Sequence, residues 1–178
     1  MLKNSTYIKD KVLIEDGKNT TKEYIKEATG VDLSVKNFYS IVKPGIILNH
    51  KTIVGDYRLI EKRNWEYKGY SFYGWYLPKG TYICSLNEGC KFGPNDVGYI
   101  VLRSSLNRNG VSLVSAVWDP NFTTKGEDGV DTMSVRITVD TPHGIYIEEN
   151  SRVGQLMVFE IEDGATQYDG QFQNKGLK

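Results

Sequence analysis

From residue 30 onward, short apolar runs alternate with glycine, proline, asparagine and aspartate. Runs of this length between turn-forming residues are typical of β-strands, and no stretch after residue 30 keeps a helical period for long. The clearest runs are Val31 to Ile41, Ile46 to Leu48 and Tyr70 to Tyr76. The pattern therefore predicts an all-β fold, a barrel or jelly roll in which each strand buries one face.

The length of 178 residues is enough for one domain with its own core, and we expect that domain to span residues 1–178. Residues 1–29 read differently from the rest. Within them, Thr20 to Ala28 is rich in helix formers and places Tyr24, Ile25 and Ala28 on one side. A short helix in an N-terminal arm is the prediction.

Charge gives no reason to expect nucleic acid or a membrane as a partner, because 22 basic and 22 acidic side chains cancel. Met1 begins a polar segment without the apolar run of a signal peptide or membrane span, which predicts a cytoplasmic protein. The two cysteines, Cys84 and Cys90, have no histidine beside them and are expected to be reduced and packed. His50 and His143 stand alone, so a metal role is not indicated.

A short polar interruption between two apolar runs carries the densest chemistry. There Ser104 and Ser105 lie between Arg103 and Arg108. Arginine offers a planar fork of donors and serine a short rotatable donor, a combination that suits an oxyanion. The residues are compatible with a phosphate-binding turn and equally with a surface turn that carries two solvated arginines.

The segment from Asp56 to Tyr76 is crowded with tyrosine and tryptophan. Aromatic side chains interleaved with arginine and lysine can stack on bases. The same composition suits a hairpin with one face on the core, and subunit interfaces are enriched in these residues too. The hairpin is the favoured interpretation, and the other two stay open.

Five motifs, in a fixed order, resemble those of the trimeric dUTPase and dCTP deaminase superfamily. They are GVDL at Gly30 to Leu33, RSSLNRNG at Arg103 to Gly110, WDPNF at Trp118 to Phe122, SRVGQLMVFEI at Ser151 to Ile161 and YDGQFQNKG at Tyr168 to Gly176. The resemblance implies a distorted dUTPase-like β-barrel that assembles as a homotrimer with active sites between subunits. It also implies a deoxynucleoside triphosphate substrate, dUTP or dCTP, and Mg²⁺ as cofactor.

For the chemistry, the resemblance assigns Asp119 as the base that activates the water attacking the α-phosphate. Gln155 helps to position that water and a phosphate oxygen. Val117 and Trp118 belong to the hairpin that presents backbone groups to the pyrimidine, and the ring of Phe122 lies against the deoxyribose.

For the phosphates, the resemblance assigns Ser104 and Arg108, together with Arg103 and Ser105 of the same motif, and it implies that the neighbouring subunit contributes them. Asp32 would hold Mg²⁺ through water, and a hard cation suits a triphosphate. The C-terminal residues 165–178 are implied to be a flexible lid. Its members that would close over the nucleotide are Tyr168, Gln171, Phe172 and Gln173.

The choice between hydrolysis and deamination depends on one strand. Deaminases of the superfamily carry a glutamate, as proton shuttle, on the strand after the hairpin. Counting from Gly129 aligns Ser134 with that glutamate, and counting from Gly126 aligns Asp131. Because Met133, Val135 and Ile137 alternate as the predicted core face, Ser134 points to the other face, on which the family has the glutamate, and is the better match. Hydrolysis of dUTP to dUMP and pyrophosphate is therefore the predicted reaction.

Two alternatives stay open. Glu127, Asp128 or Asp131 could supply the missing acid, which would make the chain a dCTP deaminase, either monofunctional or bifunctional. The second alternative is a member of the superfamily that binds nucleotides but has lost turnover.

Overall fold

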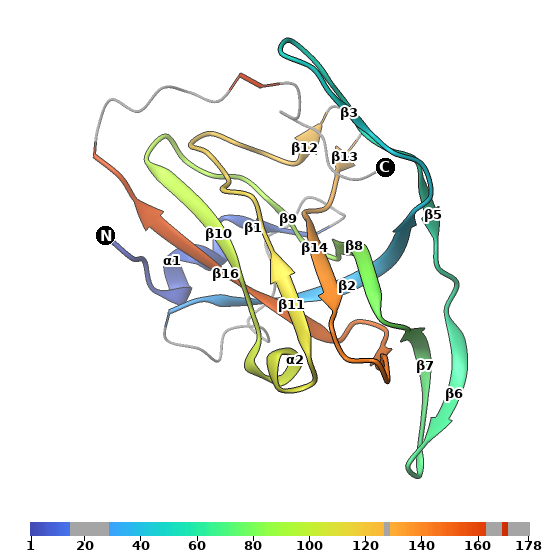
Figure 1. Cartoon of the computed structure of the whole chain (residues 1–178). Helices are drawn as coiled ribbons and strands as arrows, with labels where there is room; N and C mark the ends of the chain where they lie inside the picture. Colours follow the sequence, from blue (N-terminus) through green and yellow to red (C-terminus); the bar gives the residue numbers. More distant parts are fainter. Residues whose placement is uncertain (15–28, 127–128, 163–168, 171–178) are drawn as a thin grey trace.

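A near-closed antiparallel barrel forms the centre of the computed structural model, which describes residues 1–14, 29–126, 129–162 and 169–170 (Figure 1). Six strands of its main sheet follow the order β10-β16-β2-β8-β14-β11, and β5 pairs with β2 in addition. Their bounds are β2 Val31–Ile41, β5 Tyr57–Leu59, β8 Gly80–Leu86, β10 Asp96–Leu102, β11 Val111–Val114, β14 Ser134–Val139 and β16 Arg152–Glu160. The all-β prediction is confirmed.

The two end strands of this path, β10 and β11, are joined by the short helix α2 (Ser104–Arg108) and lie beside each other. After β11 the chain bridges back to β10 through Gly98 and Trp118. Glycine at position 98 also leaves room for the ring of Phe92, which a Cβ there would approach to 2.3 Å. The barrel is therefore closed at its seam by a bridge directly before Asp119.

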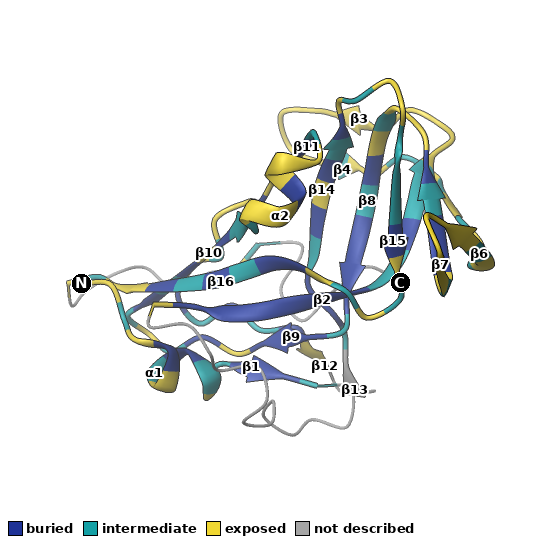
Figure 2. Cartoon of the chain, turned by 90° about the horizontal axis from the view of Figure 1, so that it is seen from below, coloured by how far each residue is buried: buried dark blue, intermediate teal, exposed yellow. Residues whose placement is uncertain are grey.

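Strand β2 lies in the interior of the main sheet, between β16 and β8, and is buried over most of its length (Figure 2). Its bounds match the predicted run, and its neighbours β8 and β16 cover both edges. The largest fully buried apolar side chains of the described residues are Trp75, Phe38, Ile8, Leu33, Leu77, Leu86, Ile100, Met133, Ile137 and Leu156. These side chains come from nearly every strand of the barrel, so burial of apolar surface is what holds the sheet closed.

The tyrosine-rich segment forms a hairpin of β6 (Arg63–Tyr67) and β7 (Tyr70–Leu77), which β15 (Ile145–Glu148) extends into a three-stranded sheet. The favoured interpretation is confirmed, because Trp75 and Leu77 point into the core and are 1% and 0% exposed. The opposite face is also aromatic. There the ring of Tyr146 lies 4.8 Å from the rings of both Tyr67 and Tyr76.

The N-terminal residues pack against the barrel. Helix α1 (Ser5–Lys9) is followed by β1 (Val12–Leu13), which pairs with β9 (Gly89–Cys90). The hydroxyl of Tyr7 donates a 2.6 Å hydrogen bond to Asp96, and Lys11 pairs with the same carboxylate at 3.0 Å. The predicted helix from Thr20 to Ala28 lies outside the described residues.

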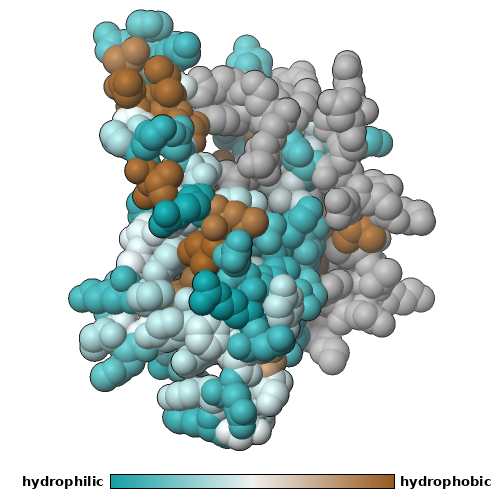
Figure 3. Space-filling view, turned by 90° about the vertical axis from the view of Figure 1, so that its right-hand side faces the viewer, coloured by the Kyte–Doolittle hydropathy of each residue, from teal (hydrophilic) through white to brown (hydrophobic). Residues whose placement is uncertain are grey.

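A narrow ribbon projects from the barrel, built from β3 (Ile46–Ile47) and β4 (Thr52–Ile53). Its aliphatic side chains face outward, and Figure 3 shows them as brown atoms along the ribbon. The exposed aliphatic residues of this segment are Ile41, Val42, Ile46, Ile47, Leu48, Ile53, Val54 and Leu59. An apolar surface of this extent is typical of a contact with another protein chain.

The remaining pair, β12 (Lys125–Gly126) with β13 (Gly129–Val130), continues the chain after Phe122. Cys84 and Cys90 are free and buried, and burial raises the pKa of both thiols. The free, buried thiols agree with the sequence-based expectation of reduced, packed cysteines. Within the described ranges, no helix has the length and apolar character needed to cross a membrane.

Candidate functional site

The first and fourth motifs meet because β2 and β16 are neighbours. Residues directly opposite in an antiparallel pair point to the same face of the sheet. This register places Asp32 opposite Gln155 and Ser34 opposite Arg152. The Gln155 side chain lies over Gly30, where a Cβ would stand 2.6 Å from it. One face of these two strands is therefore polar although it is largely buried.

Asp32 is the centre of this polar face. It is 0% exposed, and its two carboxylate oxygens form ion pairs with two different guanidinium groups. Oδ1 pairs with Nη1 of Arg103, which follows β10, and Oδ2 pairs with Nη1 of Arg152 at 2.9 Å. Burial of a charged group is tolerated only with such partners. The ion pairs thus fix the positions of the two guanidinium groups relative to Asp32.

The sequence-based assignment of Asp32 to Mg²⁺ does not fit this arrangement. Both carboxylate oxygens face positive groups, and a divalent cation beside Arg103 and Arg152 would be repelled. The described residues also contain no group of three or more histidine, cysteine or acidic side chains that could hold a metal ion. We therefore assign no protein ligand to Mg²⁺.

A pocket of about 530 Å³ opens on the exposed side of these arginines. The lining residues that argue for an anion are the donors Arg103, Ser105, Asn109, Asn150, Ser151 and Arg152. Glu148 lines it as well. The structure thus favours the phosphate-site interpretation of the serine and arginine turn over a simple surface turn. Ser104 and Arg108 are exposed on α2 and do not line this pocket.

Sequence reasoning missed two residues of this region. Arg152 precedes the glutamine of the fourth motif by three residues, so its position in SRVGQL was an available signal. Glu88 had none, because the β8–β9 turn carries no motif. Its carboxylate is 1% exposed and accepts hydrogen bonds from the backbone N–H and the hydroxyl of Ser34, at 2.9 and 2.7 Å.

Burial raises the pKa of Glu88 from 4.5 to about 7, and the hydrogen bonds from Ser34 oppose this shift only in part. A carboxyl whose pKa is higher in the folded state favours folding below pH 4.5, and this contribution is lost as the pH rises towards 7. With 1.36 kcal/mol for each pH unit, the loss amounts to about 3 kcal/mol.

We therefore expect Glu88→Gln to flatten the pH dependence of stability. The difference in the free energy of unfolding between pH 5 and pH 8 should be about 3 kcal/mol smaller than in the unsubstituted protein. Urea unfolding at both pH values measures it. Glu66→Gln, at an exposed position on β6, is the control and should leave the difference unchanged. An equal pH dependence in both variants would contradict the role of Glu88.

Asp119 lies in the loop after the bridge between Gly98 and Trp118, and its side chain is exposed. Its carbonyl oxygen accepts a hydrogen bond from the N–H of Phe122 at 3.1 Å, which closes a tight turn through Pro120. The turn fixes the backbone at Asp119 and leaves the side chain exposed to solvent.

The sequence-based roles of Trp118 and Phe122, at the two sides of this turn, can be compared with their contacts. The N–H and C=O of Trp118 both bond to Gly98 at 2.9 Å, so they are not available to a pyrimidine in the single chain. Val117, by contrast, is 57% exposed. The ring of Phe122 is 6% exposed and packs against Trp118 at 5.1 Å. Its assignment to the deoxyribose stays a prediction.

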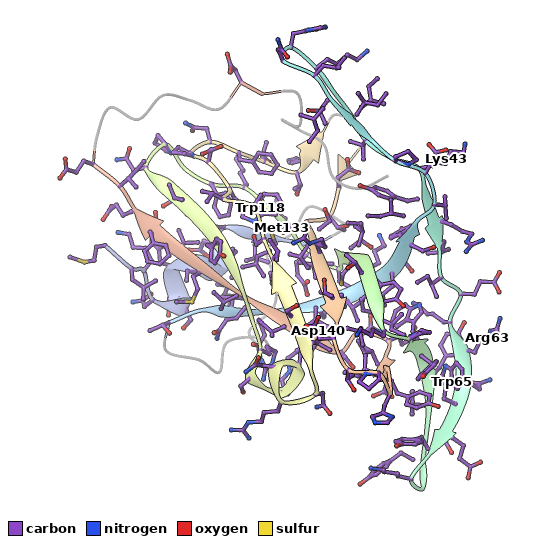
Figure 4. All side chains as sticks on the ribbon, in the orientation of Figure 1. Lys43, Arg63, Trp65, Trp118, Met133 and Asp140 are labelled. Atoms are coloured by element: carbon purple, nitrogen blue, oxygen red, sulfur yellow. The ribbon has the colours of Figure 1, made fainter. Side chains whose placement is uncertain are left out.

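The Asp119 loop and the arginine pocket lie at opposite ends of β10. Gly98 holds the loop, whereas Arg103 follows the last residue of the strand, and five residues of extended chain span about 17 Å. In Figure 4, Trp118, which directly precedes Asp119, and Asp140, whose N–H donates to the carbonyl of Gly110 shortly after α2, lie towards opposite ends of β11. One copy of the chain therefore does not bring these two parts together.

A family model described as dCTP deaminase-like matches residues 4–161. The chain belongs to the dCTP deaminase-like family. It is 34% identical over 172 residues to the probable deoxyuridine 5'-triphosphate nucleotidohydrolase of Aeropyrum pernix, with 95% of this chain and 97% of that protein covered. The protein with the same description in Halobacterium salinarum strain R1 is 32% identical over 149 residues, covering 84% and 83% of the two chains.

Among solved structures, the 2'-deoxycytidine 5'-triphosphate deaminase from Agrobacterium tumefaciens superposes with a TM-score of 0.53 at 14% identity. The match covers 88% of this chain and 47% of that chain. At this identity the likeness concerns the fold alone. The dCTP deaminase-like family is thus supported by sequence and by fold.

Within this dCTP deaminase-like chain, the register of β14 agrees with the sequence prediction. Met133, Val135 and Ile137 are 0%, 3% and 0% exposed, and Ser134 lies opposite Ser85 of β8. No carboxylate occupies position 134. Glu127, Asp128 and the lid residues Tyr168, Gln171, Phe172 and Gln173 lie outside the described residues.

Proposed function

We propose that the protein hydrolyses dUTP to dUMP and pyrophosphate. The observation that supports the proposal is the register of β14, which turns Ser134 away from the core-facing Met133, Val135 and Ile137 and onto the face on which the resemblance puts the glutamate of the deaminases. A deaminase needs a group there that passes protons to and from the base. The exposed Asp119 is, by contrast, suited to hydrolysis. The names of the relatives in Aeropyrum and Halobacterium support the same substrate.

In the proposed reaction, the carboxylate of Asp119 accepts a proton from a water molecule whose oxygen attacks the α-phosphorus. The bond from that phosphorus to the bridging oxygen breaks, and pyrophosphate leaves with the electron pair. Gln155 positions the water, and Arg103 and Ser105 bind phosphate oxygens as negative charge develops. Ser104 and Arg108 on α2 contribute to the same phosphates from the exposed side. Mg²⁺ is proposed as a partner of the triphosphate, because this ion is commonly held by phosphate and water oxygens.

The separation of Asp119 from the arginine pocket supports a homotrimer as part of this proposal. If each interface combines the Asp119 loop of one copy with the arginine pocket of the next, all three sites of a closed ring are complete. The exposed aliphatic side chains of the projecting ribbon are consistent with such contacts. The C-terminal residues 165–178 are proposed to close over the bound nucleotide.

Chromatography of the nucleotides after incubation with Mg²⁺ and either dUTP or dCTP tests the proposed function. We expect dUMP from dUTP and no change in dCTP. The appearance of dUTP or dUMP from dCTP would contradict the assignment. It would then indicate that Glu127, Asp128 or Asp131 supplies the acid missing at position 134. Absence of any product from either nucleotide would contradict the assignment as well and would favour the alternative of a member that has lost turnover.

A further inference from the structure

Two guanidinium groups line the 530 Å³ pocket, those of Arg103 and Arg152, and the proposed reaction gives a role only to Arg103. Arg152 and Arg103 lie on the two oxygens of one carboxylate, and both line the same pocket. The side chain of Arg152 is 45% exposed and that of Arg103 is 23% exposed, whereas Asp32 behind them is 0% exposed. The carboxylate is therefore enclosed, and the guanidinium groups face solvent in front of it.

A guanidinium carries five N–H donors, and the pairing with Asp32 engages Nη1 of each arginine. The remaining donors are available to an oxyanion in the pocket. Around Asp32, one carboxylate and two guanidinium groups leave a net positive charge, which favours an anion there, and Glu148 elsewhere in the lining is the charge that opposes it. The strand register explains why the geometry is rigid, since Arg152 and Asp32 both project from the paired strands β16 and β2.

We infer that Arg152 binds a phosphate group of the substrate beside Arg103, and that Asp32 is a positioning residue for both arginines and not a ligand of Mg²⁺. This inference rests on the proposed function for the identity of the substrate, a nucleoside triphosphate. The binding of a polyphosphate by the two arginines can, however, be tested without any turnover.

The probe is inorganic tripolyphosphate, titrated calorimetrically into the full chain, once in EDTA and once with excess Mg²⁺. We expect Arg152→Gln to weaken binding by about 10- to 100-fold, because it removes charge-assisted hydrogen bonds. Arg152→Lys keeps the charge but not the planar fork, so its affinity for tripolyphosphate should lie between those of the unsubstituted protein and Arg152→Gln. Arg63→Gln, an exposed arginine on β6 outside the pocket, is the matched control and should bind as the unsubstituted protein does.

Asp32→Asn separates positioning from simple electrostatics. Loss of its negative charge alone would tighten the binding of an anion, whereas loss of the positioned arginines should weaken it about tenfold, in EDTA as well as in Mg²⁺. Weakening that occurs only with Mg²⁺ would restore Asp32 as a metal ligand and overturn the inference. If Asp32→Asn does not fold, the exposed position of Arg152 still permits the test with Arg152→Gln.

The outcomes also separate this inference from the proposed function. If Arg152→Gln binds tripolyphosphate as tightly as the unsubstituted protein, the inference is wrong even when dUTP is hydrolysed. If tripolyphosphate binding depends on Arg152 but dUTP is not hydrolysed, the inference stands and the proposed function is wrong.

Discussion

Asp119→Asn is expected to lower kcat for dUTP by about 10²- to 10⁴-fold, the range typical of losing a general base. The amide has nearly the shape of the carboxylate but cannot accept the proton from the attacking water. Since the Asp119 side chain is exposed and the turn around it is held by backbone hydrogen bonds, the loop should keep its structure. The Kd of a non-hydrolysable dUTP analogue should therefore change little.

Stopped assays of pyrophosphate release measure this loss, and calorimetry measures the Kd. Asp10→Asn provides a matched control, because Asp10 is an exposed aspartate at the end of α1 that belongs to neither the pocket beside Arg103 and Arg152 nor the projecting ribbon. It should retain full activity. Unchanged turnover in Asp119→Asn would exclude this residue as the base and with it the proposed mechanism.

The largest effect on stability is expected for Trp75→Ala, which should lower the free energy of unfolding by about 3–5 kcal/mol. The indole is 1% exposed and meets the ring of Phe38 edge to face at 4.9 Å. Its Nε1–H also donates a 2.9 Å hydrogen bond to the carbonyl of Ile60. The substitution removes these contacts and leaves a cavity. A loss of this size is a large part of the about 5–15 kcal/mol that stabilise a typical domain.

Urea unfolding at a fixed protein concentration measures the change, since assembly would make the midpoint depend on concentration. Tyr70→Ala is the control on the same strand, because Tyr70 is 75% exposed and its removal should matter by less than about 0.5 kcal/mol. Similar midpoints for the two variants would show that Trp75 is not part of the stabilising core.

The main strands were predictable because local pattern and burial agree there. The run from Val31 to Ile41 forms β2 with the same bounds, and the alternation around Val135 fixes the buried face of β14. The buried face of β7 was harder to predict. Aromatic side chains occupy both sides of this strand, and alternation does not tell which side meets the core when both are apolar.

The sequence points to Asp119 through a motif within a single loop. Its role stays a prediction, and its exposure after the bridge is what that role requires. The environment of Asp32 depended on tertiary contacts, because Arg103 and Arg152 reach it from two other parts of the chain. The same holds for Glu88, whose burial against Ser34 follows from how the β8–β9 turn packs on β2. Contacts between residues so distant in sequence leave no periodic signal.

The placement of the Asp119 loop and the arginine pocket at opposite ends of β10 bears on how such proteins can diverge. Within one copy, Gly98 and Arg103 lie about 17 Å apart along the strand, so substitutions at its two ends are expected to be additive in their effect on folding stability, while both ends act on one nucleotide in the proposed trimer. With the proposed roles, residues around Val117 could change the accepted base without disturbing the packing of Arg103 and Arg152 around Asp32. A single barrel can in this way give rise to enzymes of different base preference that inherit one common means of binding polyphosphate.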